Sequence, residues 1–239
     1  MQSRRMLIVS SDWHCQPEEL IPQARELIEK AEPGEDTLVG VGDLFNFLPV
    51  GKDKFKNSKA IDDFIKLLGG QTFYYVAGNH DPYPWVKERF KDYPNIIVAR
   101  IVNFEDRWYF RHGHGWSIDW RLLRHFAPGV VEFMTEHFPA LWYWFTMKMG
   151  WIPSKQKEAL YIGGPRERQK YSDMVGIVWR HAIRHAQHNN LAVIVGHTHC
   201  SGILKRAMDG VKAVIADGGD LRDGTCLLID DDIRLFTLP

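Results

Sequence analysis

Side chains able to bind metal ions occur in five short clusters that are far apart in the sequence. The clusters are Asp12-Trp13-His14, Gly42-Asp43, Gly78-Asn79-His80-Asp81, His112-Gly113-His114 and Gly196-His197-Thr198-His199. Divalent transition metals are bound by carboxylate oxygens and by imidazole nitrogens. The clusters therefore predict a metal site, provided that the fold brings them together.

Each cluster alone is a weak signal. Asp-x-His is common by chance, and Gly42-Asp43 by itself is more simply explained as a turn, since glycine lets a chain bend sharply. The clusters around Asn79 and His197 are more specific, because each places polar groups directly after an apolar run. The occurrence of all five in one chain is the strong observation.

Each cluster follows a run of apolar residues that predicts a buried strand. In open α/β sheets, sites form beyond the carboxyl ends of the strands, so five such clusters can meet in one place. The runs are 6–10, 37–41, 72–76, 108–111 and 191–195. Further strands are expected at 96–98, 100–104, 211–215, 225–229 and 233–236.

Three helices are expected between these strands. The first spans 17–31 with Pro17 in its first turn, where proline is favoured. The second follows Ser58, a good N-cap residue, and ends at Gly69-Gly70. The third covers 166–187. Residues 49–57 are expected to form a polar loop.

The composition is that of a folded protein. Of 239 residues, 45% are hydrophobic and 25% are charged, and the formal net charge is zero, so no nucleic-acid partner is expected. The 3 cysteines favour a reducing compartment over a disulfide-bonded scaffold, which predicts a cytoplasmic protein. No apolar run reaches the length of about 18–20 residues that spans a bilayer.

The five clusters, in this order, resemble the motifs of the calcineurin-like metallophosphoesterases, from Ser10 to about Asp220. The resemblance implies an α/β fold, a four-layer sandwich of two mixed β-sheets flanked by helices. It also implies hydrolysis of a phosphomonoester, phosphodiester or pyrophosphate bond by a hydroxide that bridges two divalent ions. These ions are expected to be Mn²⁺, Fe or Zn²⁺, since Mg²⁺ is less suited to so many imidazoles.

The resemblance also assigns roles to residues. The first metal would be bound by Asp12, His14 and His199. The second metal would be bound by Asn79, His112 and His197. Asp43 would bridge the two ions, and His80 would be the catalytic residue that faces the substrate phosphate.

One departure from the family pattern leaves the surroundings of the site open. Many relatives carry a carboxylate three residues after the bridging aspartate, which orients the catalytic histidine, but this chain has Asn46. His80 is therefore expected to stabilise charge on the phosphate rather than to act chiefly as a general acid. Asn46, Asp81 and His114 are expected either to contact the substrate or to support the ligands.

The chain is expected to form one domain, 1–239, with an aromatic-rich helical cap inserted at 115–165. We favour a cap that packs on the core; the alternatives are a substrate lid and an element that contacts the membrane surface. The insert and the motif order resemble the diphosphatases that cleave UDP-2,3-diacylglucosamine, although those enzymes typically lack a counterpart of His80. The expected substrate is a phosphorylated small molecule or a lipid-linked one.

The main alternative class is a non-catalytic metal-binding scaffold, as in the retromer subunit of the same fold. Such proteins have lost residues of the site, whereas all the expected ligands and His80 are present here. The composition and motifs leave the oligomeric state open.

Overall fold

The computed structural model describes residues 6–47, 51–116, 133–134, 137–138, 141, 165–208 and 211–238. Most of the expected cap at 115–165 lies outside these residues, so its fold and its role as packing, lid or membrane element stay predictions. No helix of the described part is both long and apolar enough to cross a bilayer.

The strands form two mixed sheets. The first sheet has the order β11-β10-β1-β2-β3-β4, in which β1 to β4 are parallel and β10 runs antiparallel to β1 and β11. Its strands are β1 (Leu7–Ser10), β2 (Thr37–Val41), β3 (Phe73–Val76), β4 (Ile96–Ala99), β10 (Thr225–Ile229) and β11 (Ile233–Thr237).

The second sheet has the order β5-β6-β7-β9-β8, with β6, β7 and β9 parallel. Its edge strands β5 and β8 pair antiparallel to β6 and β9. Its strands are β5 (Val102–Phe104), β6 (Trp108–Arg111), β7 (Ala192–Val195), β8 (Gly202–Met208) and β9 (Val211–Asp217).

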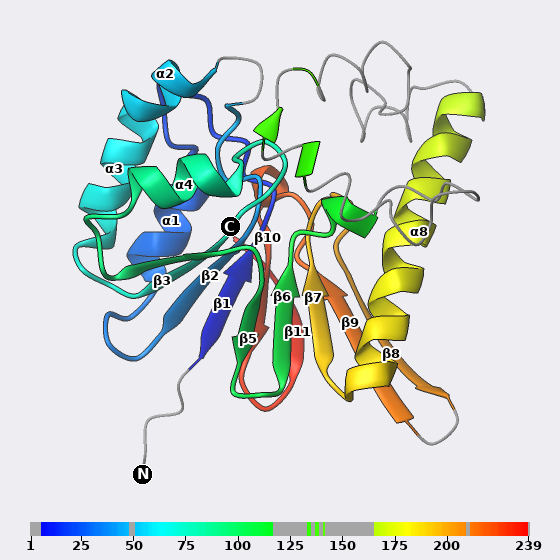
Figure 1. The fold of residues 1–239 in the computed structure, drawn as a ribbon. Helices are drawn as coiled ribbons and strands as arrows, with labels where there is room; N and C mark the ends of the chain where they lie inside the picture. The colour runs from blue at the N-terminus through cyan, green and yellow to red at the C-terminus, as the bar shows by residue number, and fades with distance from the viewer. Residues whose placement is uncertain are drawn as a thin grey trace.

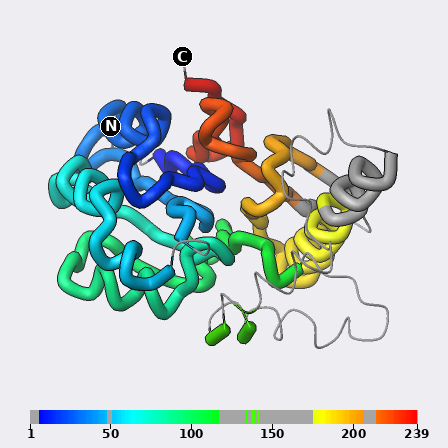
Figure 2. Tube along the Cα trace, turned by 90° about the horizontal axis from the view of Figure 1, so that it is seen from above, coloured from blue at the N-terminus to red at the C-terminus, as the bar shows by residue number. Residues whose placement is uncertain are grey.

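Helices cover the outer face of each sheet (Figure 1). Next to the first sheet lie α1 (Pro22–Lys30), α2 (Lys52–Lys56), α3 (Lys59–Leu68) and α4 (Tyr83–Arg89), whereas α8 (Pro165–Asn189) packs on β7 and β9 of the second sheet. Seen from above, the two groups of helices lie on opposite sides of the molecule (Figure 2).

Three apolar clusters fill the spaces between these layers. One lies between the first sheet and its helices, a second lies between the sheets, and a third lies under α8. The cluster between the sheets contains Val9, Val39 and Val41 together with Phe110 and Ile194. Burial on both faces explains why these strands read as continuous apolar runs. The predicted sandwich of two mixed sheets flanked by helices is confirmed.

Several local predictions need correction. The first helix begins at Pro22 rather than Pro17, because the carbonyl oxygen of Pro17 instead accepts from the Ser58 hydroxyl and from Ala60 N. The expected loop at 49–57 contains α2, and both α4 and β8 were not predicted. The N-cap at Ser58 is confirmed, since its hydroxyl accepts from Ile61 N at 3.3 Å.

Candidate metal centre

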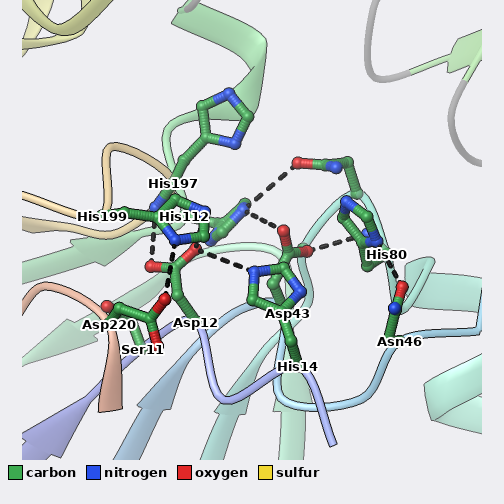
Figure 3. Close-up of polar contacts among 12 residues, drawn as sticks. Ser11, Asp12, His14, Asp43, Asn46, His80, His112, His197, His199 and Asp220 are labelled. Carbon is green, nitrogen blue, oxygen red and sulfur yellow. Dashed lines mark hydrogen bonds and ion pairs between the residues drawn. The ribbon is translucent and has the colours of Figure 1, made fainter. Parts of the chain in front are cut away.

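The five clusters meet at one edge of the sandwich. They follow the carboxyl ends of β1, β2 and β3 in the first sheet and of β6 and β7 in the second. Because the strands within each set are parallel, these ends lie side by side. Figure 3 shows the carboxylates of Asp12 and Asp43 close together with imidazoles from several loops around them.

The potential ligand atoms form three overlapping groups, and within each group all atoms lie within 4.8 Å of one another. The groups are Asp12, His14 and His199; His14, Asp43 and His80; and Asp43, His112 and His197. Asp43 belongs to the second and third groups and His14 to the first and second, so these two residues link all three groups. Asn79 joins the last group, since its Oδ1 lies 3.3 Å from His112 Nε2.

The backbone at the ligands is unusual. Five of them have positive φ angles, although none is glycine: 54° at Asp12, 48° at His14, 53° at Asp43, 69° at His197 and 54° at His199. Such conformations cost free energy and persist where surrounding structure enforces them, which is typical of functional sites.

Hydrogen bonds between the loops enforce these conformations. Asp12 N donates to the carbonyl oxygen of Gly42 at 3.0 Å, and His14 N donates to that of Asp43 at 2.9 Å. The two sheets are joined here as well, because His197 N donates to Asp12 Oδ2 at 3.0 Å. The loops after β1, β2 and β7 therefore position one another.

The glycines before the ligands provide space. A Cβ on Gly78 would lie 2.1 Å from Asp43 Oδ1, and one on Gly196 would lie 2.7 Å from the carbonyl oxygen of Val41. Only Gly42 among the three has a positive φ, 79°, and its Cβ would also meet the His112 ring at 2.4 Å. At positions 78 and 196 glycine is therefore needed for the close approach of neighbouring atoms rather than for a positive φ angle.

The His112 ring is oriented from both sides. Its Nδ1 donates to the carbonyl oxygen of Val41 at 2.9 Å, so that Nε2 points into the site. There Nε2 lies 3.1 Å from Asp43 Oδ2. A histidine whose far nitrogen is held in this way presents its other nitrogen to a metal.

The electrostatics of the site suit cations. Burial would raise the pKa of Asp43, but the imidazoles of His112 and His80 outweigh it and hold the pKa well below its ordinary value. Burial disfavours a charged His112, but the Asp43 carboxylate raises the pKa of that ring to about 10, so a metal ion at Nε2 would displace a proton. Burial and neighbouring imidazoles lower the pKa of His14 and His197, which keeps both rings neutral. Neutral imidazole is the form that binds metals.

The donor atoms fit divalent cations. Asp12 Oδ1 and His14 Nε2 are buried and accept no hydrogen bond from any group in the described part of the chain. Buried polar atoms in proteins almost always have partners, so two that converge at 3.8 Å indicate a site for a ligand. Carboxylates with neutral imidazoles are the donors that Mn²⁺, Fe and Zn²⁺ accept.

Comparison with known proteins decides the family. The sequence model described as calcineurin-like phosphoesterase matches residues 6–201, which include all five clusters. The chain belongs to the calcineurin-like phosphoesterase family. The family implies metal-dependent hydrolysis of phosphoesters, and the ligand groups found in this structure agree with that chemistry. No curated protein sequence gives a significant match.

A solved structure supports the same fold for this calcineurin-like phosphoesterase. That crystal structure aligns over 99% of this chain and 100% of its own, with 15% identity and a TM-score of 0.56. Two others align less closely. TT1561 of Thermus thermophilus aligns over 98% of this chain and 99% of its own, with 13% identity and a TM-score of 0.49. The phosphopantetheinyl hydrolase PptH of Mycobacterium tuberculosis aligns over 93% and 92%, with 14% identity and a TM-score of 0.47.

The residues with open roles occupy distinct places. Asn46 contacts His80, with its Oδ1 2.7 Å from the Nδ1 of that ring. Asp81 lies fully buried beneath the loop after β2 and accepts from the backbone amides of Asp43 and Leu44. It therefore supports a ligand and is not accessible to a substrate. The centroids of the His114 and His112 rings lie 5.4 Å apart. Burial lowers the pKa of His114 to about 3.

Three further residues of the site were not predicted. Asp217 is the last residue of β9 and Asp220 lies in the loop that follows, where its carboxylate contacts the imidazole of His199. Arg222 forms an ion pair with Asp220. The sequence did contain a signal, since Gly218-Gly219-Asp220 comes directly after an apolar strand, as Gly42-Asp43 does.

Proposed function

We propose that the chain is a hydrolase that uses two divalent ions to cleave a phosphomonoester, phosphodiester or pyrophosphate bond. The observation that carries the proposal is the position of Asp43. Its carboxylate is shared between the group that contains His14 and His80 and the group that contains His112 and His197. In two-metal sites a shared ligand holds the ions about 3.5–4 Å apart.

The chain would hold one ion through Asp12, His14 and His199 and the other through Asn79, His112 and His197, with Asp43 between them. When bound, two divalent cations neutralise charge on the phosphate and lower the pKa of water. The positive-φ backbone of the loops presets the positions of the ligands, so that little reorganisation is needed on binding.

His80 is placed to act on the substrate. Its backbone amide donates to Asp43 Oδ1 at 2.8 Å, which fixes the ring beside the metal ligands. An amide side chain offers an oxygen on one side and an NH₂ group on the other, so Asn46 can pair with either tautomer of His80. When the NH₂ group donates to Nδ1, His80 carries its proton on Nε2 and can donate to a phosphate oxygen without being charged.

The test combines metal analysis with hydrolysis assays in Mn²⁺. Wild type should hold two ions per chain and cleave p-nitrophenyl phosphate, its bis-ester or a nucleoside diphosphate sugar. Cleavage of the nucleoside diphosphate sugar would support the diphosphatase alternative. Asp43→Asn should lose both ions and turnover, because the shared ligand is lost. His80→Ala should keep both ions and turn over about 100-fold more slowly, within the range for general acid and electrostatic catalysis. Two bound ions with no turnover of any phosphoester would instead support the scaffold alternative.

A further inference from the structure

The imidazole of His199 is held by a chain of charged contacts that begins at the molecular surface. His199 Nδ1 lies 3.1 Å from Asp220 Oδ2, and His199 Nε2 lies 3.5 Å from Asp12 Oδ1 inside the site. Asp220 is 1% exposed and is paired with Arg222, whose side chain is 49% exposed. Figure 3 shows the Asp220 carboxylate next to the His199 ring, below it in this view.

Arg222 fixes the Asp220 carboxylate in two ways. Its guanidinium Nε donates to Oδ1 at 2.9 Å and to Oδ2 at 3.1 Å, and its Nη2 also donates to Oδ2. Its backbone amide donates to Oδ1 at 2.9 Å. Every one of these bonds is charge-assisted, so the rotation of the carboxylate about its side-chain bonds is strongly restricted.

The segment that carries Asp220 is itself tied to the segment that carries Asp12. Ser11 Oγ donates to the carbonyl oxygen of Gly219 at 2.9 Å, and Leu221 N donates to that of Ser11 at 3.2 Å. Asp220 therefore reaches His199 from a fixed position relative to another ligand of the same group.

His112 provides the contrast within the same centre. Its far nitrogen donates to a neutral carbonyl oxygen, that of Val41, whereas the far nitrogen of His199 meets a carboxylate. A carboxylate behind a metal-bound imidazole fixes its tautomer and increases its strength as a ligand. The two metal positions are therefore supported by different means.

We propose that Asp220 is a positioning residue for the metal site formed by Asp12, His14 and His199, and that Arg222 acts through Asp220. The inference rests on the proposed function, since it concerns one of the two metal positions. Asp220 and Arg222 therefore increase the affinity of one metal position and leave the affinity of the other unchanged.

The test is calorimetric titration of metal-free protein with Mn²⁺ alone. His199→Ala and His112→Ala, each of which removes a ligand of one group only, identify which binding step belongs to which position. Asp220→Asn should weaken the step that His199→Ala affects about 10-fold, the usual effect of losing such a support, and should leave the other step within about twofold. Asp223→Asn, which alters an exposed carboxylate on the same turn, is the matched control and should change neither step.

A double-mutant cycle tests the part played by Arg222. Arg222→Met should weaken the same step less than Asp220→Asn, because the backbone amide of residue 222 still donates to Asp220. The double variant should bind no more weakly than Asp220→Asn alone, since two residues that act through one contact are not additive. Additive losses would overturn the role of Arg222.

The remaining outcomes separate the two proposals. If wild type binds two ions and Asp220→Asn binds them equally well, or loses both equally, the inference about Asp220 is wrong and the proposed function stands. If wild type binds no Mn²⁺ at all, the proposed function fails and the inference fails with it. Melting temperatures of the metal-free variants identify any loss that arises from misfolding.

Discussion

The loops after β2 and β7 carry candidate ligands of the same centre, but they are supported differently. Each begins with a glycine at the end of a buried strand, and each lies over a fully buried carboxylate, Asp81 under the first loop and Asp217 under the second. Burial, reinforced by a nearby ligand carboxylate, raises the pKa of both groups to about 7.

The two carboxylates differ in the groups from which they accept hydrogen bonds. Asp81 binds the loop backbone directly, through the amides of Asp43, Leu44 and Phe45, and also accepts from Gly78 N and the Tyr75 hydroxyl. Asp217 reaches its loop through one side chain, the Thr198 hydroxyl at 2.6 Å, and accepts otherwise from Gly219 N.

The more heavily supported loop is the one that carries the shared ligand. A displacement of Asp43 would affect both ligand groups to which it belongs, whereas a displacement of His197 affects one. The comparison therefore predicts that changes beneath the loop after β2 cost more than equivalent changes beneath the loop after β7.

The largest effect is expected for Asp81→Asn. The amide keeps one acceptor, but its NH₂ group faces backbone N–H donors, and each buried donor left without an acceptor costs about 1–3 kcal/mol. We expect a loss of about 3 kcal/mol in the free energy of unfolding, loss of both metal ions and at least a 100-fold loss of phosphoesterase activity. Urea unfolding, metal analysis and initial rates measure the three effects.

Tyr75→Phe is the control for that variant, because it removes only the hydroxyl that donates to Asp81. It should lower the free energy of unfolding by about 1 kcal/mol and leave the metal content unchanged. Normal metal binding by Asp81→Asn would refute the support that we assign to Asp81.

A smaller effect, and a direct contrast between the loops, is expected from Gly78→Ala and Gly196→Ala. The added methyl group at position 78 would lie 2.1 Å from Asp43 Oδ1 and 2.4 Å from Asp43 N, with both atoms fixed by hydrogen bonds. At position 196 it would lie 2.7 Å from the carbonyl oxygen of Val41 and 3.0 Å from Asp12 Oδ2.

Neither glycine has a positive φ, so both effects are steric. Overpacking lowers the free energy of unfolding by about 1–3 kcal/mol. We expect the loss for Gly78→Ala to be at the upper end of this range, and we expect this variant to release both ions. Gly196→Ala should reduce affinity for the ions less. Metal titration of the two variants measures the order, and the reverse order would contradict the comparison.

The sequence was sufficient to predict that the candidate ligands come together. Asp12, Asp43, Asn79, His112 and His197 all follow apolar strands, and parallel pairing brings such strand ends together whatever the details of the loops. The strands themselves could be predicted because strands buried on both faces read as continuous apolar runs, whereas the two-sheet sandwich was implied by the resemblance to the family.

Elements without that pattern were missed for physical reasons. Helix α2 has five residues, mostly charged, and its only buried residue is Phe55, so it shows no periodicity. Helix α4 has seven residues and lies among prolines, which also favour turns. Strand β8 is an edge strand whose sequence includes Lys205 and Arg206, so no apolar run marks it.

The supporting residues could not be assigned from sequence alone, because support depends on distance. Asn46 is 34 residues from its partner His80, and Asp220 is 21 residues from His199. A departure from the family pattern at Asn46 was visible in the sequence, but the contact that it makes was not.

The smallest expected effect concerns Asp217 and pH. Its pKa of about 7 in the folded protein lies above the ordinary value of 3.8, so between about pH 4 and pH 7 the folded state keeps a proton that the unfolded chain has released. The stabilisation is therefore complete below about pH 4 and is lost as the pH rises through about 7. Asp217→Asn removes this dependence and keeps a group that can bond to Thr198 and Gly219.

The melting temperature of metal-free wild type should accordingly fall more steeply between pH 5 and pH 8 than that of Asp217→Asn. Each change of about 1 kcal/mol in relative stability, less than one pKa unit, corresponds to about 2–4 °C in a chain of this size. EDTA in every sample removes the contribution of bound metal, which stabilises the folded state by mass action. Asp81 titrates in both proteins, so its contribution cancels in the comparison. If the melting temperatures of the two proteins changed with pH in parallel, Asp217 would be ionised throughout and its loop would be supported by charge.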